Sequence, residues 1–473
     1  MILEDRSLEL PAEDLRRLIA AATERILDHI ATLPRQPAAD VEGGAELARS
    51  LVEGIPETGT SPEALLDFLF QRVIPKSLNT AGPGYLAYIP GGGIPHAAVA
   101  DLIADSVNRY VGVFAAAPGL AQLEENVVRW FCEIVGLPPG SRGVLTSGGS
   151  LANFSAVVAA RRARLPDDFL AGTIYASDQT HHAVEKAALL AGFPAGRVRA
   201  IPTDTLFRIR LDALAIQVAS DRAAGLRPFL LVGNAGTTNT GAVDDLNALA
   251  DFASAESLWF HVDAAYGGFF LLTEEGRRRM TGIARADSVV LDPHKGLFLP
   301  YGTGALLVRD AEALKRSHAL VADYLPDSPE DPDLPDYHLL SPELSRDFRG
   351  LRVWLPFKMH GIGPFRRNLE EKLALAQWAV GQLRGIPDVE ILAEPQLSIV
   401  AFRLRPAGVA DGELDALNRA VLQRVNDRRR VHMTGTLLRG RFAIRICVLS
   451  FRTHRDRMEE GLEDIRAAIA AEN

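Results

Sequence analysis

Short apolar runs that end in polar residues recur through the middle of the chain, and segments with helical spacing follow them. Residues 258–262 lead into Asp263, and residues 288–291 lead into Asp-Pro-His-Lys, which ends at Lys295. Strand and helix patterns alternate in this way from about residue 85 to about residue 378. This alternation predicts a doubly wound α/β domain.

Asp263 and Lys295 stand at the ends of two successive predicted strands. In an open α/β sheet, ligands bind at the carboxyl ends of the strands, so we expect both side chains to face one cleft. A lysine there can form an imine with a carbonyl compound. Pyridoxal 5′-phosphate (PLP) is a carbonyl cofactor whose ring nitrogen also needs an acidic partner. For these two residues alone, an ordinary ion pair at the sheet edge is the alternative, because most charged residues carry no chemistry.

Residues 143–154 have the character of a phosphate site. A short apolar run leads into Ser147-Gly-Gly-Ser150, and a long Ala-rich segment follows. Glycines let the backbone approach an anion, and the free N–H groups of a helix start attract phosphate. Ser150 is expected to cap that helix, and a plain strand-to-helix turn is the alternative. Neither the Walker nor the dinucleotide glycine spacing is present, so nucleotide binding is disfavoured.

Two other predicted strand ends carry polar residues that suit a cofactor. His181 stands between a strand and a helix, where an imidazole can lie over a ring, and Thr237 and Thr238 can donate hydrogen bonds. A surface histidine and simple turn chemistry are the alternatives. His181 and His182 are neighbours that point apart on a helix, and no set of cysteines or carboxylates completes a zinc site, so no metal is expected.

Five motifs follow one another along the chain: Thr-Ser-Gly-Gly-Ser, Ser-Asp-Gln-Thr-His, Gly-Thr-Thr, His-Val-Asp-Ala-Ala-Tyr and Asp-Pro-His-Lys. In this order they resemble the group II PLP-dependent decarboxylases of fold type I, and among these the aromatic-L-amino-acid decarboxylase type. The resemblance covers nearly the whole chain. Its last two motifs are highly specific in combination, whereas Gly-Thr-Thr alone would mean little.

The resemblance implies a role for most of the residues named so far. Lys295 would hold PLP as an imine, Asp263 would pair with the protonated ring nitrogen, and His181 and Ala265 would contact the two faces of the ring. The full set implied for cofactor binding is Gly148, Gly149, Ser150, His181, Thr237, Thr238, Asp263, Ala265, His294 and Lys295. Asp292 stands where relatives often have Asn; an acid beside a phosphate is unfavourable, so no role is assigned to it.

A Pro- and Asp-rich stretch at residues 322–335 has neither helical nor strand spacing and is expected to be a long loop. The resemblance implies that this loop is an active-site lid and that Tyr324 returns a proton to the substrate Cα after CO₂ departs. An aromatic anchor for an acidic loop is the alternative for Tyr324. Arg346 and Arg349, in the segment that follows, are expected to be structural or loop-docking residues.

The resemblance also implies which segments line the substrate side-chain pocket, and here the chain departs from the family. The implied pocket residues are Tyr88, Pro90, Gly91, Tyr110 and Gly112. Aromatic amino acid decarboxylases tend to carry Phe-Pro-Thr where this chain has Ile-Pro-Gly91, so a hydroxyl is lost, and Gly112 is expected to open volume. The tyrosines, with Phe114, still favour an aromatic or large substrate side chain. Arg109 could pair with an acidic substrate, although a surface or dimer-contact role is commoner.

The chain is expected to divide into an N-terminal helical segment (1–84), a large PLP-binding α/β domain (85–380) and a small C-terminal α+β domain (381–473). The implied fold is that of PLP fold type I, which is aspartate aminotransferase-like. Residues 11–33 have helical apolar spacing, Ser61-Pro62-Glu63 marks a second helix start, and Asp244-Asp245 marks another. An amphipathic helical segment without its own core needs a partner surface. In the family this region packs across a homodimer, and packing within one subunit is the alternative.

Composition bounds the remaining possibilities. The 473 residues are 47% hydrophobic and 23% charged, with a net charge of −9, which suits a globular protein and disfavours nucleic acid as a partner. Only two cysteines, Cys132 and Cys447, are present, so a disulfide framework is excluded. The start of the chain has no signal-peptide pattern, and no apolar run approaches bilayer length, so a cytoplasmic location without membrane contact is expected.

These observations predict a PLP-dependent decarboxylase. It would remove the α-carboxylate of an L-amino acid, aromatic or large, to give the amine and CO₂. The alternatives are a decarboxylation-dependent aldehyde synthase, against which Tyr324 argues because those relatives tend to carry Phe there, and another PLP-dependent carbon–carbon lyase.

Overall fold

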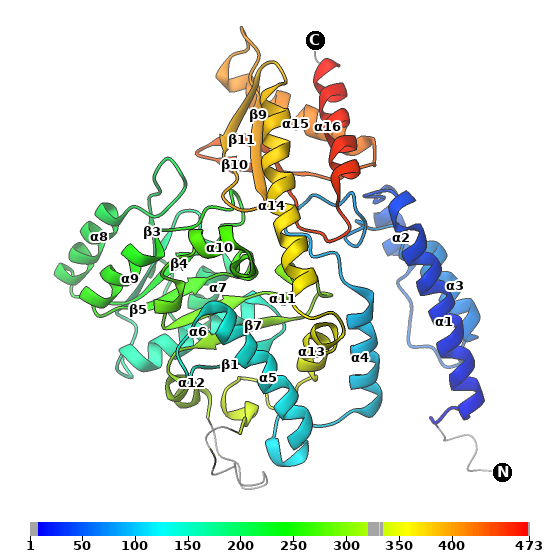
Figure 1. Cartoon of the computed structure of the whole chain (residues 1–473), viewed down its shortest axis with the longest axis horizontal. Coiled ribbons are helices and arrows are strands. Elements are labelled where there is room, and N and C mark those ends of the chain that lie inside the picture. The colour runs from blue at the N-terminus through cyan, green and yellow to red at the C-terminus, as the bar shows by residue number, and fades with distance from the viewer. Residues whose placement is uncertain (1–7, 320–330, 332–333, 472–473) are drawn as a thin grey trace.

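The structure is a computed structural model, and it describes residues 8–319, 331 and 334–471. It contains a seven-stranded sheet and a four-stranded sheet. In Figure 1 the larger sheet lies in the lower half of the molecule, and the smaller one lies at the top beside the C-terminus. This α/β architecture, with a mainly parallel sheet and a separate small α+β unit, is the predicted one.

The large sheet has the strand order β1-β7-β6-β5-β4-β2-β3. Strand β7 runs antiparallel to both of its neighbours, β1 and β6, whereas β2 to β6 pair in parallel. The strands are β1 (Arg142–Thr146), β2 (Gly172–Ser177), β3 (Val198–Ile201), β4 (Arg227–Asn234), β5 (Trp259–Asp263), β6 (Ser288–Leu291) and β7 (Gly304–Val308).

Apolar residues of the central strands enter two different cores, one on each face of the sheet. In β4, Leu230 and Val232 pack into one core while Leu231 packs into the other. Successive side chains of a strand point to opposite faces, so a strand that is apolar at every position is buried on both sides. The apolar runs of the sequence therefore become central strands.

Helices cover both faces of this sheet. Residues of α5, α8 and α9 contribute to one core, and residues of α6, α7 and α12 to the other. Helix α5 ends at Gly136, whose φ of +79° is the left-handed conformation that a helix C-terminus commonly adopts. The helices of this region are α4 (Pro95–Val107), η4 (Phe114–Ala116), α5 (Pro118–Val135), α6 (Gly149–Arg164), α7 (Ala183–Leu190), α8 (Leu211–Ala223), α9 (Leu246–Ala255), η5 (Gly268–Leu272), α10 (Glu274–Arg279), η6 (Ile283–Arg285), α11 (Pro293–Gly296), α12 (Ala311–His318), η7 (Tyr337–Leu339) and α13 (Arg349–His360).

The small sheet is antiparallel, with the order β10-β11-β9-β8. The predicted division into residues 1–84, 85–380 and 381–473 stays a prediction. Helix α14 crosses residue 380, and its C-terminal half packs into the core of the small sheet, so the two sheets share this helix. The elements are α14 (Gly363–Arg384), β8 (Val389–Ala393), β9 (Ile399–Leu404), α15 (Asp411–Asp427), β10 (Thr434–Leu438), β11 (Arg441–Cys447) and α16 (Arg455–Ala470).

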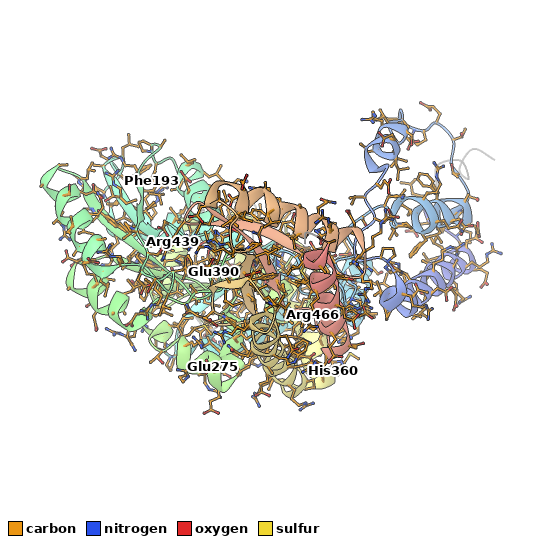
Figure 2. All side chains as sticks on the ribbon, turned by 90° about the horizontal axis from the view of Figure 1, so that it is seen from above. Phe193, Glu275, His360, Glu390, Arg439 and Arg466 are labelled. Atoms are coloured by element: carbon orange, nitrogen blue, oxygen red, sulfur yellow. The ribbon has the colours of Figure 1, made fainter. Side chains whose placement is uncertain are left out.

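The N-terminal helices stand apart from the two sheets in both views (Figures 1 and 2). Helix α1 buries none of its residues, although it carries the apolar spacing that predicts a helix with one covered face. Ser61 caps α3 as predicted, because its side chain accepts a hydrogen bond from the N–H of Ala64. The elements are α1 (Ala12–Thr32), η2 (Leu33–Arg35), α2 (Gly44–Ser50), α3 (Pro62–Phe68) and η3 (Leu69–Val73).

None of the helices in the described part of the chain is both long and apolar enough to cross a membrane.

Candidate cofactor site

A cavity of about 270 Å³ lies at the carboxyl ends of strands β1, β2, β4, β5 and β6. It is smaller than a cavity of about 760 Å³ that lies between α1, α3 and residues 77–81. The smaller cavity is the chemical one, because it gathers the polar residues that follow five strands. Its lining is Ser147, Gly148, Gly149, Ser150, Asn153, His181, Ala183, Asn234, Gly236, Thr237, Thr238, Asp263, Ala265, Tyr266, Asp292, His294 and Lys295.

All ten residues that the sequence implies for cofactor binding line this one cavity: Gly148, Gly149, Ser150, His181, Thr237, Thr238, Asp263, Ala265, His294 and Lys295. They come from segments as far apart as β1 and α11. The parallel register explains the meeting, because Asn234 at the end of β4 pairs with Asp263 at the end of β5. The individual roles of these residues stay predictions.

Lys295 lies in the short helix α11, directly after β6. Its Nζ is 2.8 Å from Oδ2 of Asp292, and the Asp292 side chain is only 2% exposed. Burial alone would lower the pKa of Lys295, but the neighbouring charge and hydrogen bond of Asp292, together with Asp263, raise it above its ordinary value. Asp292, to which the sequence assigned no role, is thus the direct partner of Lys295.

Asp263 ends β5 and points its carboxylate at the cavity. One oxygen accepts a hydrogen bond from the N–H of Ala265 at 3.1 Å, and the other accepts from Nδ2 of Asn153 at 3.2 Å. These two donors fix the orientation of the carboxylate. A buried acid at this place suits a cationic group in the cavity.

The turn from β1 into α6 forms a cradle for an anion. Helix α6 begins at Gly149 and its N-cap residue is Gly148, so the prediction that Ser150 caps the helix is wrong. The helix starts earlier than the serine spacing suggests, and Ser150 therefore lies inside its first turn. The first N–H groups of a helix have no partner within the helix and can bind an anion.

Close packing explains why the cradle is built from glycines. A Cβ at Gly149 would lie 3.0 Å from Oδ2 of Asp292 and 3.3 Å from Cβ of Ala265. On the opposite side, a Cβ at Gly304, the first residue of β7, would lie 2.5 Å from Cα of Gly148. Any side chain at these positions would displace the turn.

His181 precedes α7, and its Nδ1 accepts a hydrogen bond from the N–H of Ala183 at 3.2 Å. Burial lowers the pKa of His181, and the charge of Asp263 only partly opposes this. Because Nδ1 accepts, the proton of the neutral ring lies on Nε2. His181 and His182 both have exposed surface in the single chain.

The two threonines after β4 lie in a tight turn beside the cavity. Oγ1 of Thr237 is 2.8 Å from Oγ1 of Thr240 and accepts from the N–H of Ala242 at 3.1 Å, so turn chemistry occupies this hydroxyl. The carbonyl oxygen of Thr238 accepts from Nε of Arg445 at 2.9 Å.

None of the five predicted substrate-pocket residues, Tyr88, Pro90, Gly91, Tyr110 and Gly112, lines this cavity. The two tyrosines are exposed in the single chain, at 59% and 36%. Their assignment to the pocket stays a prediction.

The two departures from the family pattern lie where a neighbouring backbone packs closely. A Cβ at Gly112 would lie 2.7 Å from the carbonyl oxygen of Leu344, and the expectation that Gly112 opens pocket volume stays a prediction. A Cβ at Gly91 would overlap the carbonyl oxygen of His294. Both glycines allow a neighbouring backbone to approach closely.

The remaining predicted residues fall outside the cavity. Arg346 is fully buried and contacts Oε1 of Glu124 at 2.6 Å, and it also donates to the carbonyl oxygen of Leu145 at 2.9 Å. Arg349 pairs with Glu343 at 2.7 Å. Both arginines are thus buried and ion-paired, and the expectation that they are structural or loop-docking residues stays a prediction.

Two predicted positions add nothing to the described cavity. Arg109 is exposed. Tyr324 lies outside the described residues.

Sequence reasoning gave no role to seven residues that line the cavity: Ser147, Asn153, Ala183, Asn234, Gly236, Tyr266 and Asp292. Asn153 stands four positions after Gly149, one helical turn further on the same face, and this spacing could have identified it. Arg445 was missed as well. It is 3% exposed and joins the Thr238 turn to the carbonyl oxygen of Tyr88, and no hydrogen bond of its Nη2 is found among the described residues.

The residues present fit PLP and do not form a metal site. Within the described part of the chain, no cluster of three or more histidines, cysteines and carboxylates could hold a metal ion. The glycine cradle at the start of α6 suits the phosphate, Lys295 suits the carbonyl, and the acid Asp263 suits the ring nitrogen.

Comparison with known proteins gives the same cofactor and a reaction. The profile of the family described as "Pyridoxal-dependent decarboxylase conserved domain" matches residues 48–405. The aromatic-L-amino-acid decarboxylase of Bacillus atrophaeus is 35% identical over 463 residues, which cover 98% of this chain and 96% of that protein.

Two solved structures share the fold over nearly the whole chain. The crystal structure of Oryza sativa TDC with PLP and tryptamine has a TM-score of 0.93 and 27% identity, and covers 98% of this chain and 99% of that one. The fold of Rhodiola rosea 4-hydroxyphenylacetaldehyde synthase is also shared, with a TM-score of 0.91, 24% identity and coverage of 98% and 99%. The chain has fold type I, uses PLP, and belongs to the pyridoxal-dependent decarboxylase family.

Proposed function

We propose that the enzyme removes the α-carboxylate of an aromatic or other large L-amino acid and releases the amine and CO₂. The observation that carries this proposal is the meeting of Lys295, Asp263 and the start of α6 in one cavity. The similarity to the aromatic-L-amino-acid decarboxylase of Bacillus atrophaeus supports an aromatic amino acid as the substrate class. The exposed rings of Tyr88 and Tyr110 offer apolar surface for a large side chain.

PLP, when bound, supplies a ring that accepts the electron pair released as the carboxylate leaves. Lys295 would bind the cofactor covalently and yield its place to the substrate amine. Asp263 would hold the proton on the ring nitrogen, since a nearby anion favours the charged form of that nitrogen. Gly148, Gly149 and Ser150 would hold the phosphate.

The remaining cavity residues would orient the cofactor and control protons. His181, neutral with its proton on Nε2, and Ala265 would contact the ring. Asp292, at 2.8 Å from Nζ of Lys295, would hold the displaced lysine as its ammonium form. Thr237, Thr238 and His294 would complete the walls. Tyr324 is proposed as the proton donor to Cα on the sequence alone.

The other carbon–carbon lyase reading fits the cavity less well. A phosphate-bearing substrate would need basic groups beyond those that hold the cofactor. Among the described lining residues, the cationic candidates are His181, His294 and Lys295, and two aspartates face them.

We also propose that the enzyme is a homodimer in the cytoplasm. The uncovered apolar side chains of α1 and α4 support the dimer, and the free, buried thiols of Cys132 and Cys447 support a reducing compartment.

A panel of L-amino acids, scored for CO₂ release and for the mass of the product, tests the reaction and its substrate. We expect Lys295→Ala to lose both the visible absorbance of the bound cofactor and CO₂ release. Lys315→Ala, which removes an exposed lysine from α12, should change neither. CO₂ release at the parent rate by Lys295→Ala would contradict the proposal, and an aldehyde with peroxide as the main product would favour the aldehyde synthase alternative.

A further inference from the structure

A chain of buried hydrogen bonds runs behind Asp263, away from the cavity. Asn153 donates from Nδ2 to Oδ2 of Asp263 at 3.2 Å, and its Oδ1 is 3.0 Å from Nε2 of His261. Nδ1 of His261 is 2.8 Å from Oγ of Ser288, which accepts from Nε1 of Trp259 at 2.8 Å. We call these four residues, Asn153, His261, Ser288 and Trp259, the Asp263 network.

The chemistry of the members sets the direction of every hydrogen bond in the network. Nδ2 of Asn153 faces two acceptors, Oδ2 of Asp263 and the carbonyl oxygen of Gly149, so Oδ1 of the same amide faces Nε2 of His261. The proton of a neutral His261 then lies on Nε2 and is donated to Oδ1 of Asn153. Nδ1 of His261 therefore accepts from the hydroxyl of Ser288, whose oxygen also accepts from the Trp259 indole N–H.

Burial and a second contact support this direction. Asn153, His261 and Ser288 are 2%, 1% and 0% exposed, so water does not compete. Burial lowers the pKa of His261 to about 4, although Asp263 opposes the shift, and the ring is neutral at neutral pH. Nδ2 of Asn153 also donates to the carbonyl oxygen of Gly149 at 2.9 Å, which only an amide nitrogen can do.

The consequence for Asp263 follows from the orientation of Asn153. With the nitrogen toward Asp263, the carboxylate accepts hydrogen bonds on both oxygens, which hold it in one orientation. If the amide turned over, its oxygen would face the carboxylate, and two acceptors would oppose each other. The same network ties Gly149 at the phosphate cradle to the carboxylate of Asp263.

We propose that His261, acting through Asn153, is a positioning residue that keeps the carboxylate of Asp263 oriented toward the ring nitrogen of the cofactor. This rests on the proposed pairing of Asp263 with that nitrogen. Ser288 and Trp259 fix the ring of His261 and its hydrogen. The sheet supplies the alignment, because His261 on β5 is paired in register with Ser288 on β6.

The experiment uses the PLP-loaded enzyme with ¹⁵N in the pyridine ring. The ¹⁵N chemical shift reports how far the ring nitrogen is protonated, and equilibrium dialysis gives the dissociation constant of PLP. His261→Leu removes both ring nitrogens at similar volume, whereas His261→Gln can still accept from Ser288 and donate to Asn153. Tyr175→Phe is the control, because it removes a buried hydroxyl on β2 that bonds to Asp221.

We expect His261→Leu to move the ¹⁵N shift toward the unprotonated form and to raise the dissociation constant of PLP by about tenfold, the usual effect of losing a hydrogen bond to a charged group. His261→Gln should restore the shift and keep the dissociation constant within about threefold of the parent. Tyr175→Phe should leave the ¹⁵N shift unchanged, even if it lowers stability.

Two comparisons separate the possible failures. If Asp263→Ala leaves the ¹⁵N shift unchanged, the proposed pairing with the ring nitrogen fails. If Asp263→Ala moves the shift and His261→Leu does not, the pairing stands and the positioning role is overturned. Should His261→Leu not fold, Ser288→Ala and Trp259→Phe give the same readout: each should move the shift in the same direction by a smaller amount, and no movement in both would overturn the proposal.

Discussion

At the scale of single residues, the motifs identify the groups that meet the cofactor, and burial decides what the others do. Arg346 and Glu124 illustrate the second case, because they form an ion pair whose side chains are both 0% exposed. Burial raises the pKa of Glu124 despite the opposing charge of Arg346. The pair joins α5 to the segment before α13.

Removing one partner of this pair should destabilise the protein strongly. We expect Arg346→Met to lower the free energy of unfolding by about 3 to 5 kcal/mol, because it leaves a buried carboxylate uncompensated. Glu124→Gln in the same chain should recover a large part of the loss. Equilibrium urea unfolding of the cofactor-free protein measures both. Arg278→Met breaks an exposed pair with Glu275 and should change the free energy by less than about 1 kcal/mol. Equal losses in Arg346→Met and Arg278→Met would contradict this account.

His261 should make the protein sensitive to acid. Its pKa is about 4 in the folded protein and 6.5 in the ordinary, unfolded case, so the unfolded chain binds the proton first as the pH falls. The contribution is fully present above pH 6.5 and is lost as the pH falls to 4, by about 3 kcal/mol. His261→Gln does not titrate, so its free energy of unfolding should fall less across this window. If the free energy of unfolding of the parent and of His261→Gln falls equally between pH 6.5 and 4, His261 does not cause the acid sensitivity.

The cavity residues that the sequence missed depend on contacts that no local pattern contains. Asp263 and Lys295 are visible because each ends an apolar run, but the pairing of His261 with Ser288 depends on the register of β5 against β6. The contact of Asp292 with Lys295 depends on how tightly α11 turns.

At the scale of elements, the sequence places the strands and most helix starts, and it errs where a glycine replaces the expected cap. Asp245 caps α9 as predicted, through a hydrogen bond from the N–H of Ala248 at 3.1 Å. Asp244, beside it, instead accepts from the backbone N–H groups of Ile209 and Asn234. Asp244 and Asp245 share the same sequence motif, but Asp245 caps a helix and Asp244 binds backbone N–H groups of other segments.

The caps give a paired prediction. Asp245→Ala should lower the free energy of unfolding by about 1 kcal/mol, because it removes a real N-cap. Ser150→Ala should leave the stability of the cofactor-free protein within about 0.5 kcal/mol, because Ser150 is not a cap. It should instead raise the dissociation constant of PLP if the hydroxyl binds phosphate. Thermal unfolding of the cofactor-free protein and a PLP titration measure the two effects. A stability loss in Ser150→Ala equal to that in Asp245→Ala would restore the capping role.

At the scale of the whole molecule, the alternation of strands and helices predicts the class but not the strand order. Strand β7 lies between β1 and β6 and runs antiparallel to both, and this placement depends on pairing between residues far apart in the sequence, which local patterns do not reveal. For the N-terminal helices, the sequence predicts an amphipathic helix but does not say what covers its apolar face. In the single chain the apolar face of α1 is uncovered. Leu15, Ile19, Ile26 and Leu27 on α1 are each more than 40% exposed.

The proposed homodimer should depend on the apolar face of α4. Leu102 and Ile103 are 51% and 46% exposed there, so a double substitution to Glu should dissociate the dimer by burying charge in the interface. Ile216→Glu on α8 is the control, because Ile216 is 71% exposed on another helix and should not affect assembly. Sedimentation equilibrium reads the result. A monomeric parent protein, or a dimer that survives the double substitution, would contradict the proposed interface.

Strand β7 lies between the two strands that lead to the glycine cradle and to Lys295. The cradle follows β1 and the lysine follows β6, and these strands are two strand spacings of about 4.8 Å each apart. Because β7 runs the opposite way, it brings its first residue, Gly304, to this edge in place of a connecting loop. Backbone hydrogen bonds between β1, β7 and β6 therefore set the spacing of the strands that lead into the site, and this spacing does not depend on which side chains those strands carry.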